Sequence, residues 1–170
     1  DRLEADLVFL KNVDNVVPDH LKPETYLYRT ALAGHLLVLQ ESLHRLLDGL
    51  VQDPGDRKLI GTAADFAQGE LSISLPGDFM QWPKERKGAY LVQRLNRPMR
   101  VCSMVRNIGE PGGGPFWVED QEGLLSRQIV EEPQVDKDSP RQMEVYSTSS
   151  HFNPTDMVCG VRDHAGAAFP

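Results

Sequence analysis

The N-terminal part of the chain combines a short apolar run with a long helical stripe of leucines. The run at residues 7–10 (LVFL) is typical of a strand buried on both faces, as in a parallel sheet covered by helices. After a loop marked by Pro18 and Pro23, apolar positions recur every three or four residues over about 24–50, which predicts a long amphipathic helix. The stripe consists of Leu32, Leu36, Leu39, Leu43, Leu46 and Leu50. A strand followed by such a helix is half of a β-α-β unit.

Shorter elements follow in the rest of the chain. The pattern predicts a short helix at 59–67, a short strand in the alternating ELSISL segment (70–75), and a second clear helix at 84–95 after Pro83. Strands are predicted at 99–105, 115–118, 127–132 and 157–161, with loops at 109–114 and 136–154. This succession predicts an α/β fold in which a mixed, mostly parallel sheet is flanked by helices.

Composition narrows the class of protein. The chain has 170 residues, 40% of them hydrophobic and 25% charged, which fits one globular domain. Its net charge of -7 disfavours nonspecific binding to nucleic acid or to an anionic membrane. No apolar run approaches the roughly 20 residues that span a bilayer.

The two cysteines bear on the state of the thiols and on the location of the protein. Cys102 and Cys159 lie in apolar runs, which favours buried thiols and a cytoplasmic protein, although a disulfide stays open at this point. No cysteine or histidine spacing indicates a zinc site.

Both ends lie close to predicted strands, so residues 1–170 are expected to be one partial domain of a longer protein.

Polar residues directly after the first strand form the first candidate site. Asp14, flanked by Asn12 and Asn15, is suited to hold Mg²⁺, which takes one or two carboxylates and completes its shell with substrate phosphate. The alternative is an Asx turn, in which these side chains bond only nearby backbone. On the residues alone, the turn is favoured.

The Gly-rich segment GEPGGGPFW (109–117) is the second candidate. Gly112, Gly113 and Gly114 let backbone amides approach a ligand, so the segment can cover a substrate or simply connect two strands. No Lys-Ser/Thr pair follows and a strand comes next, so it is neither a P-loop nor a dinucleotide-binding fingerprint.

Two further clusters carry candidate chemistry. In QIVEEPQVD, Glu131 and Glu132 can accept hydrogen bonds from sugar hydroxyls or act as acid and base, or one of them simply faces solvent. In HFNPTDMVC, His151 can contact phosphate, Asn153 is a candidate ligand contact and Asp156 a candidate metal ligand, but the same residues also suit a turn. The nearby cations that can face phosphate are Lys11, Lys22, Arg100 and Arg106.

Taken together, these stretches resemble a bacterial domain-of-unknown-function family, number 4301. The resemblance lies in DLVFLKNVDNVVPD, RPMRVCSMVRNIGEPGGGPFWV, QIVEEPQVD and HFNPTDMVCGVRD, in this order over nearly the whole chain. Members of that family are longer than this chain, which agrees with a fragment. The family name implies no reaction.

A weaker similarity to the UDP-sugar pyrophosphorylases, nucleotidyltransferases of the GT-A type, does imply one. Their N-x-D-N strand end, whose aspartate binds the catalytic Mg²⁺, is similar to residues 12–15, which makes Asp14 the catalytic and metal-binding candidate and reverses the preference for a turn. Their V-V-E-Y-S-E strand is similar to residues 129–132, which favours Glu131 as the sugar contact. A later N-H-F segment is loosely similar to residues 150–153. The resemblance implies a GT-A-like fold.

The function expected on this basis is Mg²⁺-dependent nucleotidyl transfer to a sugar 1-phosphate, or binding of a nucleotide sugar. The triphosphate-gripping G-x-G-T-R loop of those enzymes does not occur in these residues, so the chain alone is expected to be inactive. The alternatives are a GT-A glycosyltransferase and a non-catalytic binding or structural module of the same fold. A hydrolase that uses Glu131 and Glu132 as a pair is the weakest alternative, because neighbours on a strand point to opposite faces.

Overall fold

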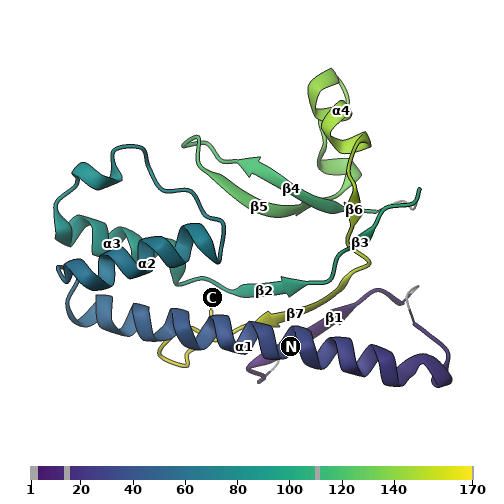
Figure 1. Ribbon diagram of the computed structural model, residues 1–170, viewed down its shortest axis with the longest axis horizontal. Helices are drawn as coiled ribbons and strands as arrows, with labels where there is room; N and C mark the ends of the chain where they lie inside the picture. Colours follow the sequence, from purple (N-terminus) through teal and green to yellow (C-terminus); the bar gives the residue numbers. More distant parts are fainter. Residues whose placement is uncertain (1–3, 14–15, 110–111, 170) are drawn as a thin grey trace.

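The computed structural model describes residues 4–13, 16–109 and 112–169, which form a mixed α/β fold with three small sheets (Figure 1). The helices are α1 (Lys22–Gln52), α2 (Arg57–Gly69), α3 (Lys84–Leu95) and α4 (Pro140–Ser147), with the 3-10 turns η2 (Asp19–Leu21), η3 (Phe79–Gln81) and η4 (Glu132–Gln134). The strands are β1 (Leu7–Lys11), β2 (Met99–Cys102), β3 (Val105–Arg106), β4 (Gly114–Glu119), β5 (Leu125–Val130), β6 (His151–Phe152) and β7 (Asp156–Gly160). Within the described residues, no helix combines the length and apolar character that crossing a membrane requires.

The main hydrophobic core lies where α1, α2 and α3 pack together. The predicted leucine stripe of α1 supplies Leu43 and Leu50, and Leu47, which was not predicted, is buried with them against apolar residues of the two shorter helices. Those residues include Ile60, Ala63, Ala67, Leu91 and Leu95. Helix α2 starts at Asp56, whose carboxylate accepts hydrogen bonds from the backbone N–H groups of Lys58 (2.8 Å) and Leu59 (3.1 Å). The helix predicted at 84–95 is confirmed, and those at 24–50 and 59–67 are confirmed with slightly longer bounds.

The prediction of a mostly parallel, GT-A-like sheet is wrong. Strand order in the largest sheet is β1-β7-β2, and every strand pair formed by the described residues is antiparallel. β1 and β2 run in the same direction, as a β-α-β unit requires, but β7 from the end of the chain inserts between them and opposes both. β1 is therefore an edge strand, and Phe9 and Leu10 are 44% and 46% exposed rather than buried on both faces.

Of the other predicted strands and loops, some are confirmed and some are wrong. Strands are confirmed near 115–118, 127–132 and 157–161, whereas the predicted strand 99–105 is divided into β2 and β3. The ELSISL segment is not a strand, and the polar segment 136–154 contains α4 and β6 instead of a continuous loop.

Hydrogen bonds and an ion pair attach the β4–β5 hairpin to three other parts of the chain. Ser74, in the segment after α2, donates its backbone N–H to the Leu125 carbonyl at 3.0 Å. Arg94 of α3 pairs with Asp120 in the hairpin turn at 3.2 Å. Arg100 of β2 donates to the Gln128 side chain at 3.3 Å. The hairpin is thus held beside the edge of the larger sheet.

The His44 side chain on α1 should make stability depend on pH. Burial lowers the pKa of His44 below its ordinary value of 6.5, and nearby His164 lowers it further, while Asp48 and Asp163 act in the opposite direction. Because the unfolded chain then binds the proton more readily, the free energy of unfolding should fall as pH drops below 6.5 towards the folded-state pKa, and this contribution should be constant above 6.5.

Urea unfolding of the wild type and of His44→Gln at about pH 7.5 and about pH 5.5 would check this expectation. The variant should lose less stability than the wild type on acidification. An equal loss in both proteins would contradict the assignment to His44.

Candidate functional site

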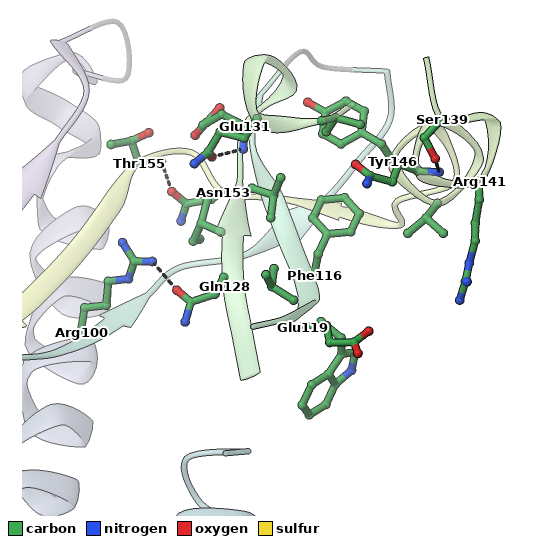
Figure 2. A pocket seen from close by; sticks show the side chains of 18 of the residues that line it. Arg100, Phe116, Glu119, Gln128, Glu131, Ser139, Arg141, Tyr146, Asn153 and Thr155 are labelled. Carbon is green, nitrogen blue, oxygen red and sulfur yellow. Dashed lines mark hydrogen bonds between the residues drawn. The ribbon is translucent and has the colours of Figure 1, made fainter. Parts of the chain in front are cut away.

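An open pocket of about 1070 Å³ lies between the β4–β5 hairpin, η4 and α4 (Figure 2). The Arg100 side chain of β2 and the segment before β7 complete its wall. This volume lies just above the roughly 300–1,000 Å³ of typical small-molecule sites. The pocket brings together the Glu131 and Asn153 segments, which are far apart in the sequence, so the candidate site is built around it.

An aromatic pair forms one wall of this pocket. The rings of Phe116 on β4 and Tyr146 on α4 are stacked, with centroids 5.6 Å apart and planes inclined by 21°. The Tyr146 hydroxyl donates a hydrogen bond to the Gly112 carbonyl at 3.2 Å, which ties α4 to the Gly-rich segment. Burial, and next the Glu132 and Glu131 carboxylates, raise the pKa of Tyr146, so its hydroxyl keeps its proton. Trp117, the next residue of β4, also lines the pocket and is 60% exposed, but it points to the opposite face of the strand from Phe116.

Glu131 and the Gly-rich segment meet at the end of β5. The Glu131 backbone N–H donates to the Gln134 side-chain oxygen at 2.9 Å, which fixes the turn into η4 (Figure 2). Gly113 lies so close to the Glu131 carboxylate that a Cβ atom there would overlap it. A Cβ atom on Gly114 would lie 2.9 Å from the His151 carbonyl oxygen. The His151 backbone therefore requires a glycine at position 114, whereas a Cβ atom at position 113 would displace only the flexible carboxylate of Glu131.

Glu132 has a different environment from Glu131. It begins η4 and forms an exposed ion pair with Lys137 at 3.0 Å, and the residues that line the pocket include Glu131 but not Glu132. The two carboxylates are therefore not a matched pair in one cavity.

Asn153 is the buried polar residue at the back of the pocket, with 5% of its surface exposed. Its amide Nδ2 donates to the Ser103 carbonyl at 2.7 Å, and its Oδ1 accepts from the Thr155 backbone N–H at 3.0 Å. Its backbone N–H donates to the Gly113 carbonyl at 2.7 Å. Thr155 has a φ of 53°, which is unfavourable for a β-branched residue, so the bond from Asn153 stabilises a strained turn. Asn153 thus holds the Gly-rich segment against the main sheet.

The other predicted residues that the structure describes do not line this pocket. Both carboxylate oxygens of Asp156 are paired with cations, Lys11 at 3.1 Å and Arg29 at 3.3 Å. The exposed His151 ring accepts or donates a hydrogen bond at Nδ1 with the Ser150 hydroxyl at 2.9 Å. The Asn12 backbone N–H donates to the Thr155 carbonyl at 3.0 Å. Asp14 and Asn15 lie outside the described residues.

The predicted phosphate-binding cations are also dispersed. Arg100 lines the pocket, whereas Lys22 pairs with Asp19 and Arg106 lies on the short strand β3. Arg141 of α4, which was not predicted, lines the pocket and forms no ion pair with a described residue.

A family comparison agrees with the resemblance seen in the sequence. The model of the family described as Domain of unknown function (DUF4301) matches residues 1–170. The chain belongs to this family. No curated protein and no solved structure matches it.

The described part of this DUF4301 domain does not provide a metal centre. It contains no group of three or more His, Cys, Asp or Glu side chains arranged to hold an ion. Asp156 has a cation at each carboxylate oxygen, which does not suit the metal-ligand role predicted for it. Cys102 and Cys159 are free thiols on neighbouring strands, and burial raises the pKa of each.

The pocket residues that were not predicted from the sequence lie mainly on α4. Tyr146 and Arg141 lie in a segment interpreted as loop because of its many polar residues. A signal was present: Ser139 precedes Pro140, and its hydroxyl caps the helix by accepting from the Gln142 backbone N–H at 3.4 Å. This Ser-Pro start would have identified a short helix.

Proposed function

We propose that this domain binds a nucleotide sugar in the pocket formed by β4, β5 and α4. The observation that carries the proposal is that Glu131, the residue resembling the sugar contact of UDP-sugar pyrophosphorylases, lines an open pocket while its carboxylate packs against Gly113 of the Gly-rich segment. Carboxylates accept hydrogen bonds from sugar hydroxyls, and the exposed face of Trp117 offers a stacking surface for a sugar or base. Arg100 and Arg141 also line the pocket, and a diphosphate bound beside either side chain would pair with its guanidinium group.

A calorimetric titration of UDP-glucose against the wild type and Glu131→Gln would test this proposal. The variant should bind at least about 10-fold more weakly, since a hydrogen bond to a charged group contributes roughly 1.5–3 kcal/mol. UDP, which keeps the diphosphate but lacks the glucose ring, should bind both proteins equally. This comparison separates a lost sugar contact from a general change in the pocket.

Glu132→Gln is the matched control, because it removes the adjacent carboxylate, which is paired with Lys137 outside the pocket. Its affinity for UDP-glucose should stay within about 2-fold of the wild type. If no UDP-sugar binds, or if both substitutions weaken binding equally, the proposal is wrong.

Assays of product release would distinguish the possible activities of this protein. Pyrophosphate formed from UTP and a sugar 1-phosphate would indicate nucleotidyl transfer, whereas UDP released from UDP-sugar would indicate a glycosyltransferase. Binding without either product would indicate a non-catalytic module. Repeating the titration with Mg²⁺, with EDTA and with Asp14→Asn tests the predicted metal role of Asp14 separately.

A further inference from the structure

A second cavity, of about 750 Å³, lies between α3, the segment 74–78 and the turn of the β4–β5 hairpin. In Figure 1 the hairpin turn stands beside the loop that connects α2 with α3. The Ser74–Leu125 hydrogen bond and the Arg94–Asp120 ion pair connect these walls. No described residue lines both this cavity and the pocket beside α4, so the two are separate. We call it the α3 pocket, and its polar and aromatic lining includes Asp78, Trp82, Arg86, Tyr90, Gln93 and Glu122.

Two hydrogen-bond donors in the wall of the α3 pocket have no acceptor. The Trp82 Nε1–H and the Tyr90 O–H groups are buried and form no hydrogen bond with any described residue, although both side chains line the pocket. The two rings meet edge to face, with centroids 5.2 Å apart. Burial raises the pKa of Tyr90, so its hydroxyl keeps its proton and can donate. Because unbonded buried donors are unfavourable, this pair indicates that the pocket takes up a molecule with acceptor oxygens.

Arg86 is the side chain that such a molecule would displace. Its guanidinium group lies over the Trp82 ring, 3.8 Å from the centroid. Arg86 is exposed and forms no ion pair with a described residue. An exposed cation–π contact is weak, so the side chain can move aside. Its movement uncovers one face of the Trp82 ring, against which an apolar surface of a ligand can stack.

The other polar side chains of the α3 pocket fit a ligand that both donates and accepts hydrogen bonds. Those of Asp78, Gln93 and Glu122 form no hydrogen bond or ion pair with a described residue. The carboxylates accept, the carboxamide does both, and Arg86 donates. One cation and two carboxylates give the lining a formal charge of -1, which disfavours a phosphate or another anion. Hydroxyl groups supply donors and acceptors without charge, and a sugar ring adds an apolar face for Trp82.

We propose that the α3 pocket binds a neutral saccharide, with Trp82 as its stacking surface and the Trp82 Nε1–H and Tyr90 O–H groups as donors to its oxygens. The volume of about 750 Å³ lies within the roughly 300–1,000 Å³ of small-molecule sites. It suits a disaccharide better than a single amino acid, whose zwitterion would also match the charges. The proposal is carried by other residues than the nucleotide-sugar site and does not rest on it.

Nuclear magnetic resonance of the indole N–H groups would test this proposal. The chain has two tryptophans, Trp82 in the α3 pocket and Trp117 in the other one, so their signals report the two pockets separately. Trp117→Phe assigns the signals. Maltose, cellobiose and lactose, each titrated to about 20 mM, cover millimolar dissociation constants. At least one should shift the Trp82 signal to saturation and leave the Trp117 signal in place. No saturable shift of Trp82, or a shift produced by free alanine but by no disaccharide, would overturn the proposal.

Tyr90→Phe removes the unbonded hydroxyl and keeps the ring. It should weaken binding of that disaccharide at least about 3-fold, while the urea midpoint without saccharide should not fall, because the hydroxyl has no protein partner to lose. Tyr28→Phe is the matched control, since Tyr28 is 67% exposed on α1 and lines neither pocket. Its affinity should stay within about 2-fold of the wild type. A Tyr90→Phe protein that binds as tightly as Tyr28→Phe, or that is destabilised because the hydroxyl bonds a water molecule, would contradict the assigned donor.

Discussion

Replacing Gly88 by alanine should lower the free energy of unfolding by about 3 kcal/mol or more. Gly88 is buried on α3, where that helix crosses the turn between α1 and α2. A Cβ atom at this position would overlap the carbonyl oxygen of Pro54, which is backbone and cannot turn aside. The helix would have to move away from the turn, and the core contacts of Leu91 and Leu95 would loosen with it.

Gly61→Ala gives the opposite expectation for the same chemical change. Gly61 lies on the exposed side of α2, and a Cβ atom there would meet nothing within 4 Å. Alanine in place of a helical glycine should therefore stabilise the domain by about 0.5–1 kcal/mol. Urea unfolding of both variants measures the two effects directly. Equal effects in both variants would contradict the close packing of α3 against the turn.

Local patterns in the sequence predicted the helices of this fold but not the pairing of its strands. The helices follow from local periodicity, so α1 and α3 were predicted nearly to their ends. Of the predicted mostly parallel sheet, the structure shows only the common direction of β1 and β2. The place of β7 did not follow from local patterns, because pairing of Asp156–Gly160 with both strands depends on contacts across most of the chain. The alternating segment 70–75 was misread because it bonds to the hairpin mainly at Ser74 instead of forming a ladder.

The candidate site was also predictable only in part. The Gly-rich segment and Glu131 were both selected from sequence, and the structure places them in contact. Asp156 was selected as a metal ligand, but a carboxylate next to Lys11 and Arg29 serves an ion-pair network, and those partners are distant in sequence. The aromatic wall was not predicted, because α4 was interpreted as a loop. The many polar residues of this segment outweighed the helix start at Ser139-Pro140.

Asn153→Ala should cost about 2–4 kcal/mol of stability and also weaken binding in the proposed site. The substitution leaves the Ser103 carbonyl and the Thr155 N–H without their side-chain partner in a buried setting. Because Thr155 is held at a positive φ by this turn, the segment leading into β7 should relax. Relaxation would in turn release the Gly113 carbonyl, which the Asn153 backbone bonds, and shift the glycine away from Glu131.

Amide hydrogen exchange gives a local measurement to accompany urea unfolding of Asn153→Ala. The Thr155 amide should exchange at least about 10-fold faster in the variant under native conditions, beyond what its lower global stability explains. Ser150→Ala is the control, since the exposed Ser150 side chain bonds only the neighbouring His151 ring, and it should change stability by less than about 0.5 kcal/mol. If Asn153→Ala is as stable as Ser150→Ala, the buried amide does not hold the Gly-rich segment. If it is destabilised but binds UDP-glucose as the wild type does, that segment is not part of the binding site, and the pocket would have to recognise its ligand through the hairpin and α4 alone.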